Sequence, residues 1–385
     1  MPPVLTVFID GLKPESLKHM KFVSSFNVRR IKTELINYSN TCHASMYTGV
    51  YPSKHQIQFI WKFSPETSPF NLLKRLGIHK FPHNLYSKFM AYAVISLLSK
   101  KRIILHGFRS LAKQPLSRWS LFDFEVVKYW GRPNSFLGKY PTIFNILKRN
   151  RIKYKIIWMT QGSLRRIKFG SQFKPWTYLF IGQLEIPSHK YGQDSLMARK
   201  LLEEIDKNLE DAYRKFEKKF GDFYFMVFSD HGHVKVESRI DLYQLFKSAG
   251  KDLNNYIHFI DAVHARFWFE NDKQKSEVEE ILSRLCDKGF ILTKEILKKY
   301  HSDVPDNRYG DLIFYLDKPY VFDVVDPKTK SMHGYLPDYP DCDGVFVSNK
   351  EIKKKVIILQ DIAPSILQAL ELEIPDYMDG EPVWK

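Results

Sequence analysis

Seven side chains have the chemistry of a metal-dependent hydrolytic site, and each falls at the end of a predicted strand or in a loop close behind one. They are three carboxylates, three imidazoles and one hydroxyl: Asp10, Ser39, Glu185, His189, Asp230, His231 and His333. Carboxylate oxygens and imidazole nitrogens are ligands that suit zinc, manganese or iron. Two ions about 3.5–4 Å apart can hold an attacking hydroxyl and a phosphoryl oxygen together. The set therefore predicts a two-metal site in which Ser39 is the nucleophile.

Each of these residues also has an ordinary structural explanation when it is taken alone. Ser39 could cap a helix, and Asp10 or Asp230 could close a turn after a strand. The chain contains 13 histidines, so some of them are spare. The joint placement of the seven residues favours chemistry over these separate explanations.

The Ser39 corner lies in the segment 38–52. Ser39, Asn40 and Thr41 are predicted to cap a helix that closes at Thr48-Gly49, before Pro52. This places the Ser39 hydroxyl on a tight turn near the positive end of a helix.

Apolar runs alternate with helical patterns along most of the chain. Strands are predicted at 4–9, 154–159, 178–182, 223–228, 258–269 and 311–316, and helices near 141–150, 195–220, 273–288 and 361–370. This alternation indicates an α/β fold with a mostly parallel central sheet flanked by helices. Asp10 and Asp230 then lie at the carboxyl edge of that sheet, where such folds bind ligands.

The segment 63–136 departs from this pattern and is predicted to be an inserted, helical, basic and aromatic-rich lid or cap. The catalytic core then comprises residues 1–62 and 137–385. Between Thr67 and Phe122 the chain carries ten basic residues and no acidic one. Such a segment attracts an anionic partner. Its apolar run 89–98 is too short to cross a membrane but suits a lid or an interfacial helix.

The bulk composition sets the wider expectations. The chain has 385 residues, of which 44% are hydrophobic, so it can bury a large core. No run approaches the roughly 20 apolar residues of a membrane span, and no charged leader precedes the first strand. The three cysteines do not have the spacing of a metal site or a disulfide framework. We expect a cytoplasmic protein, peripheral at an acidic membrane if the insertion contacts lipid.

The motifs resemble those of the type I phosphodiesterase/nucleotide pyrophosphatase branch of the alkaline phosphatase superfamily. The resemblance rests on Asp10, the stretch 39–52, Glu185-x-x-x-His189-x-Tyr191-Gly192, Ser229-Asp230-His231-Gly232, His333-Gly334 and the ending 361–380. It covers both ends and most of the middle of the chain, but not the insertion.

The resemblance implies an alkaline-phosphatase-like core with two divalent ions, usually zinc. Asp10, Ser39, Asp230 and His231 would surround one ion. Glu185, His189 and His333 would surround the other. Ser39 would form a covalent phospho-enzyme that water then hydrolyses.

Three departures from the family pattern bear on activity. Ser39 replaces the usual Thr and keeps the hydroxyl. Glu185 replaces the usual Asp and lengthens the arm. Nucleotide-cleaving members carry an Asn about twenty residues past the nucleophile, where this chain offers Gln58 as a substitute.

We therefore predict a metal-dependent phosphohydrolase acting on a phosphodiester or pyrophosphate, with a phosphorylated small molecule, a nucleotide or a lipid-linked anion as substrate. A monoesterase, or a transferase or mutase that passes the phosphoryl group to an alcohol, remains an alternative. A nucleic-acid-binding module would account for the net charge of +16. However, no RNA- or DNA-binding motif accompanies the basic residues, so no specific nucleic acid is predicted.

The basic stretch Lys100-Lys101-Arg102 gives a first test, because it is predicted to contact an anionic substrate or membrane surface. Neutralising all three residues should weaken binding to acidic liposomes or raise KM. Liposome co-sedimentation and steady-state kinetics measure the two effects. If neither changes, the predicted role of the insertion is wrong.

Overall fold

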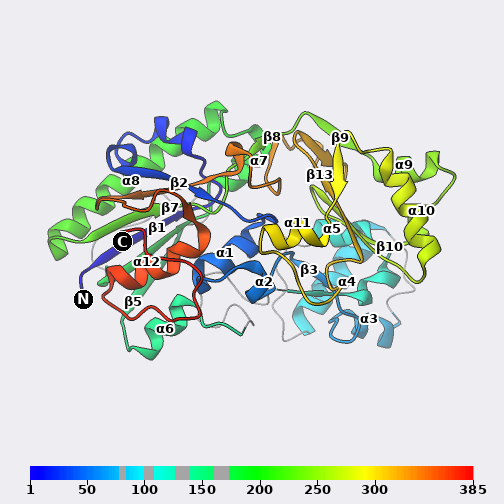
Figure 1. Cartoon of the computed structure of the whole chain (residues 1–385), viewed down its shortest axis with the longest axis horizontal. Coiled ribbons are helices and arrows are strands. Elements are labelled where there is room, and N and C mark those ends of the chain that lie inside the picture. The colour runs from blue at the N-terminus through cyan, green and yellow to red at the C-terminus, as the bar shows by residue number, and fades with distance from the viewer. Residues whose placement is uncertain (78–83, 99–107, 126–138, 160–172, 385) are drawn as a thin grey trace.

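A seven-stranded sheet forms the centre of the structure, a computed structural model that describes residues 1–77, 84–98, 108–125, 139–159 and 173–384 (Figure 1). The strand order is β17 (Ile357–Ile358), β2 (Asn27–Lys32), β16 (Gly344–Ser348), β7 (Tyr224–Phe228), β1 (Val4–Ile9), β6 (Trp176–Ile181) and β5 (Tyr154–Met159). Only β16 runs against its neighbours, since it pairs antiparallel with β7 and β2 while the other pairs are parallel. The predicted mostly parallel α/β sheet is confirmed.

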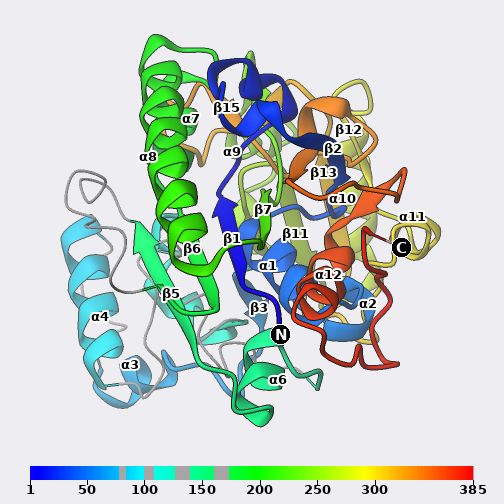
Figure 2. The same cartoon turned by 90° about the vertical axis from the view of Figure 1, so that its left-hand side faces the viewer.

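Helices cover both faces of this sheet, and the alternation of side chains along β1 shows why. Leu5, Val7 and Ile9 pack on the face covered by α8 (Leu196–Phe220). Val4 and Phe8 pack on the opposite face, which is covered by α1 (Ser39–Thr48), α6 (Ile143–Arg149) and α12 (Ile362–Ala369). Figure 2 shows α8 and α12 on opposite sides of β1. A strand buried on both faces requires a continuous apolar run, which the sequence has.

A second, antiparallel sheet lies beside the first. Its order is β10 (Ile257–Ile260), β11 (His264–Trp268), β13 (Leu312–Leu316) and β12 (Gly289–Ile291), and it packs with α9 (Leu242–Ser248) and α10 (Asp272–Ser283). The single strand predicted at 258–269 is wrong, because a turn at 261–263 divides it into β10 and β11. Asp261 N donates to His264 O at 2.8 Å to close that turn. The turn residues Ala262 and Val263 are neither Gly nor Asn, the residue types from which a tight hairpin turn is predicted.

Shorter elements complete the described chain. The helices are α2 (Pro52–His55), α3 (Asn71–Arg75), α4 (Leu85–Leu98), α5 (Phe108–Lys113), α7 (Glu185–Tyr191) and α11 (Lys294–Lys299). The paired strands are β3 (Trp61–Phe63) with β4 (Phe122–Phe124), β8 (Val234–Lys235) with β15 (Ser331–Met332), and β9 (Ser238–Ile240) with β14 (Tyr320–Phe322). The sequence pattern did not predict β2, β16 and β17, because these strands are short or mix polar with apolar residues.

The described part of the 63–136 segment packs against the antiparallel sheet. Its aromatic core around Trp119 includes Phe259 of β10 and Trp268 of β11. Arg118 donates to the carbonyl oxygen of Tyr256 at 2.6 Å. The boundaries of an insertion and its role as a lid remain predictions, and the basic stretch 100–102 lies outside the described residues.

Two expectations about composition can be compared with the structure. Among the described residues, no helix combines the length and the apolar character that a membrane crossing requires. Cys42, Cys286 and Cys342 are all free thiols. The cytoplasmic location stays a prediction.

Helix α1 ends where the sequence predicts, because Gly49 leaves the helix in the left-handed conformation with φ of 73°. Its carbonyl oxygen accepts from Asp379 N at 2.8 Å, which ties this corner to the C-terminal segment. A Cβ on Gly49 would lie 2.9 Å from Cγ and Sδ of Met378. The glycine is therefore required both for its backbone conformation and for the close approach.

Gly49→Ala is expected to destabilise the fold more than Gly250→Ala. Both glycines have positive φ, 73° and 72°, but an added Cβ on Gly250 meets nothing within 4 Å. The left-handed conformation costs an alanine about 1–2 kcal/mol at either site. Contact with Met378 should add about 1 kcal/mol or more at Gly49 only. Urea unfolding measures the difference, and equal losses in the two variants would contradict the steric argument.

Candidate active site

The seven residues predicted to form the site come together at the carboxyl edge of the parallel strands. Asp10 follows β1, and Asp230 and His231 follow β7. Ser39 is the first residue of α1. Glu185 and His189 lie four residues apart on α7, so they share one face of that helix, and His333 directly follows β15. Segments more than 300 residues apart in the chain, those of Asp10 and His333, thus contribute to one place.

One group of these side chains surrounds the Ser39 hydroxyl. Ser39 Oγ lies 3.5 Å from His231 Nε2. The same nitrogen lies 3.3 Å from Asp230 Oδ2 and 3.9 Å from Asp10 Oδ1. Both of those carboxylate oxygens are buried and have no hydrogen-bond partner among the described residues. Buried charge without a partner is costly, so these oxygens point to a cation.

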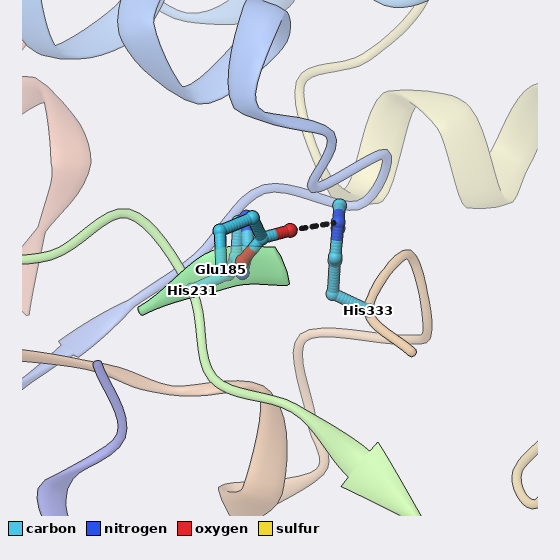
Figure 3. A group of neighbouring side chains, drawn as sticks. All are labelled: Glu185, His231 and His333. Atoms are coloured by element: carbon cyan, nitrogen blue, oxygen red, sulfur yellow. Dashed lines mark ion pairs between the residues drawn. The ribbon is translucent and has the colours of Figure 1, made fainter. Parts of the chain in front are cut away.

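The second group is built around Glu185, which Figure 3 shows together with His333 and with His231 of the first group. Glu185 Oε1 lies 2.6 Å from His189 Nε2 and 3.2 Å from His333 Nε2. The His333 ring stacks on the His231 ring, with centroids 3.9 Å apart and planes inclined by 13°. This stack joins the two groups into one centre.

The hydrogen bonds of the histidine rings show which ring nitrogen carries the hydrogen and which one directs a lone pair toward the centre. In His189, His231 and His333, Nδ1 lies 2.9, 3.1 and 2.9 Å from a backbone carbonyl oxygen. A carbonyl oxygen only accepts, so Nδ1 carries the hydrogen and Nε2 of a neutral ring has its lone pair free. A lone pair directed at a carboxylate oxygen is repulsive unless a proton or a metal ion lies between them. Metal-binding histidines are held in this way.

The pKa values agree with a centre that needs positive charge. Burial, together with the charge of Glu185, raises the pKa of Asp230 to about 8. Burial and the charges of Asp230 and Glu185 raise the pKa of Asp10 well above its ordinary value. Burial holds the pKa of His231 well below its ordinary value, so this ring is neutral. The residues present therefore fit divalent metal ions with oxygen and nitrogen ligands.

The predicted capping role of Ser39 is wrong, and the reason is informative. Tyr38 occupies the position before the helix, and Ser39 is already helical and makes no capping bond. Thr41 Oγ1 donates to the carbonyl oxygen of Gln58 instead of capping. The Ser39 hydroxyl is thus not engaged by the helix and faces His231.

Gln58 is the one predicted substrate-binding residue that lies within the described part of the chain, and its side chain is bonded elsewhere. Gln58 is only 1% exposed, and its Nε2 donates to the carbonyl oxygen of Ser302. Lys100, Lys101 and Arg102 lie outside the described residues. Substrate binding by these residues stays a prediction.

His233 is a site residue that the sequence reasoning missed. Its Nε2 lies 2.8 Å from Glu185 Oε2, and only 3% of the residue is exposed. The signal was the second histidine of Asp230-His231-Gly232-His233, because any histidine beside a predicted ligand pair is a candidate ligand. The family motif Ser229-Asp230-His231-Gly232 ends before this histidine and so does not point to it.

Comparison with known proteins agrees with the fold and with the motifs. The family described as "Type I phosphodiesterase / nucleotide pyrophosphatase" matches residues 172–336. The predicted resemblance to this family is confirmed, and with the α/β fold it supports a hydrolase of the phosphodiesterase type. No curated protein matches the chain significantly.

Three solved structures are similar to this chain over nearly its whole length. Human ectonucleotide pyrophosphatase/phosphodiesterase 5 matches with a TM-score of 0.67 and 16% identity, over 98% of this chain and 97% of that one. The murine protein matches with a TM-score of 0.63 and 14% identity, and an inactive murine variant in complex with AMP with 0.62 and 14%; each match covers 97% of this chain and 96% of that one. The predicted alkaline-phosphatase-like fold is therefore confirmed.

Asp230→Asn is expected to stabilise the metal-free protein at alkaline pH. A carboxyl group whose pKa is raised from 3.8 to about 8 stabilises the fold at low pH, and this contribution is lost as the pH rises through the folded-state value. The amide removes the buried charge and can still accept the bonds from Gly11 N and His231 N, each 3.1 Å long.

Urea unfolding after chelation should show the variant about 1–3 kcal/mol more stable than wild type at pH 8, with the gap closing toward pH 4. Asp323→Asn, at an exposed position, is the control and should change little. A metal-free wild type that is as stable as the variant at pH 8 would show that the buried carboxyl group carries no such penalty.

Proposed function

We propose that this protein is a metal-dependent phosphohydrolase of the phosphodiesterase/nucleotide pyrophosphatase type, with Ser39 as its nucleophile. The observation that carries the proposal is the Ser39 hydroxyl, which lies 3.5 Å from His231 Nε2 beside two buried carboxylate oxygens without partners. A structural serine has no need of such surroundings. The family match over residues 172–336 supports the same class of reaction.

The chain would hold two divalent ions, most simply zinc, with manganese or iron as alternatives. Asp10, Ser39, Asp230 and His231 form the first ligand set. Glu185, His189 and His333 form the second. When bound, the ions supply Lewis acidity that favours ionisation of the Ser39 hydroxyl and neutralises charge on a phosphoryl group.

The positions of these side chains are fixed by the fold. Ser39 begins a ten-residue helix, so the positive end of the α1 dipole lies where an anionic phosphoryl group would sit. The lone pairs of His189, His231 and His333 are aimed by backbone carbonyls, as described above. The centre is thus preorganised, and little rearrangement of the chain is required for the reaction.

The reaction has two displacements. The Ser39 oxygen gives up its proton and bonds to phosphorus while the bond from phosphorus to the leaving oxygen breaks, and that oxygen takes up a proton; a covalent phosphoserine is left. Water then attacks phosphorus, the serine oxygen departs, and a proton from the water restores the hydroxyl. Splitting the hydrolysis in this way is the general advantage of a covalent intermediate.

An anionic phosphorylated substrate fits the charge of the centre and of the chain. The inactive murine structure in complex with AMP favours a nucleotide or a related phosphorylated small molecule. The side chain of Gln58 is bonded to Ser302 and does not supply the amide predicted for nucleotide cleavage. The balance among diester, monoester and transfer is therefore the property that an assay must determine.

Ser39→Ala should abolish metal-dependent turnover of bis-p-nitrophenyl phosphate, with a loss of at least about 10³-fold in kcat, because no other hydroxyl replaces the nucleophile. Ser39→Thr keeps the hydroxyl and should retain activity. Wild type and variants are assayed after chelation with zinc or manganese restored, and p-nitrophenyl phosphate is run in parallel to give the diester-to-monoester ratio.

Ser248→Ala, at an exposed serine on α9, is the matched control and should behave as wild type. Metal-dependent turnover that survives in Ser39→Ala would remove Ser39 from the chemistry. Turnover that appears only with an added alcohol acceptor would assign a transferase to the same site.

A further inference from the structure

We propose that His233 is a direct ligand of the metal ion held by Glu185, His189 and His333, so that this ion has three imidazole ligands. The inference rests on the proposed two-metal site and adds a residue outside the ligand set that the family resemblance implies. Three observations carry it: the position of the ring, the way its other nitrogen is held, and the space made for it by Gly11.

The His233 ring lies with the other rings around Glu185. Its centroid is 4.8 Å from that of His189 and 5.5 Å from that of His333. Potential ligand atoms of Glu185, His189 and His233 lie within 4.8 Å of one another. One ion can therefore contact all three side chains.

Ser331 fixes the orientation of the His233 ring. Ser331 Oγ donates to the carbonyl oxygen of Ser188 at 2.6 Å, so its lone pairs are left to accept. His233 Nδ1, at 3.2 Å, is then the donor to Ser331 Oγ. The backbone carbonyl of Ser331 accepts from His189 Nδ1 at 2.9 Å. One residue thus orients two imidazoles, with Nε2 of each facing Glu185.

The Nε2 atom of His233 needs a cation that it shares with Glu185. Because Nδ1 donates to Ser331 Oγ, Nε2 of the neutral ring carries a lone pair. That lone pair lies 2.8 Å from a carboxylate oxygen. With the proton on Nδ1, neither atom can donate to the other, and a shared metal ion satisfies both.

The longer arm of Glu185 and the absence of a side chain at Gly11 make this arrangement possible. Glu185 directs Oε1 to His189 and His333, and Oε2 to His233. A Cβ on Gly11 would lie 2.5 Å from Glu185 Oε2 and 2.7 Å from His233 Nε2. The substitution of Glu for the usual Asp therefore coincides with an additional imidazole that the longer arm reaches.

Three imidazoles and one carboxylate make this site different from the one beside Ser39, which has two carboxylates and one imidazole. Imidazole-rich sites favour zinc and cobalt over harder ions such as magnesium and manganese. The site that contains His233 should therefore retain zinc when the site beside Ser39 exchanges its ion.

Metal titration of the full chain tests this inference without reference to activity. The metal-free protein is titrated with Zn²⁺ by calorimetry and with Co²⁺ by absorption spectroscopy. Wild type, His233→Gln and His233→Cys are compared with His258→Gln, which removes an equally buried histidine. His258 is bonded to Tyr243 and to the backbone of Tyr256, outside the candidate centre.

Wild type and His258→Gln should each bind two equivalents. His233→Gln should bind one equivalent normally and the other at least about 100-fold more weakly. His233→Cys should show a thiolate-to-cobalt charge-transfer band that is absent from wild type, because only direct coordination produces that band. Circular dichroism confirms that each variant is folded, and the cysteine variant preserves the test if the glutamine variant does not fold.

Three results would overturn the inference. If His233→Cys binds two Co²⁺ ions without the charge-transfer band, or if His233→Gln titrates like wild type, His233 is not a ligand although the two-metal site stands. If wild type itself binds no divalent ion, the proposed function fails, and this inference fails with it.

Discussion

The carboxylates at the sheet edge, each facing an imidazole lone pair, are the constraint on which the rest of the site depends. Asp10, Asp230 and Glu185 meet in one largely buried centre, where the charge of Glu185 raises the pKa of both aspartates. Such a concentration of like charge opposes folding unless cations neutralise it. The ring stack of His231 on His333, and the carbonyl oxygens behind the rings, then have a clear purpose. They aim neutral donors at the positions where those cations would sit.

The fold supplies this arrangement by ending parallel strands at the same edge. The neighbouring parallel strands β1 and β7 deliver Asp10 and Asp230 in register, since Val4 of β1 lies opposite Tyr224 of β7. Helix α7 adds two of the proposed ligands, Glu185 and His189, which lie one helical turn apart. The antiparallel sheet contributes no ligand of this centre, but its core extends to the described part of the 63–136 segment through Phe259 and Trp268. The candidate site residues thus come from the edge of the central sheet, and the antiparallel sheet supports the described part of the 63–136 segment.

Much of this could be predicted from the sequence, because strongly apolar strands and motif residues at their ends are local signals. The strands 4–9 and 154–159 were predicted at the bounds that the structure has. The division of 258–269 was missed because its turn lacks glycine. His233 and the true partner of Gln58 were missed for another reason: both depend on which side chain faces which across the fold. Sequence spacing carries no information about such contacts between distant segments.

The bond between His333 Nδ1 and the carbonyl oxygen of Asn37 joins residues 296 positions apart. During synthesis on the ribosome, the residues around Ser39 emerge long before the histidine that completes the centre. If the proposed two-metal site is correct, a nascent chain carries the proposed nucleophile and Asp10 before His333 is present to complete the second ligand set. Maturation of such a centre would be a late event, in which closure of the long-range contacts is linked to metal uptake.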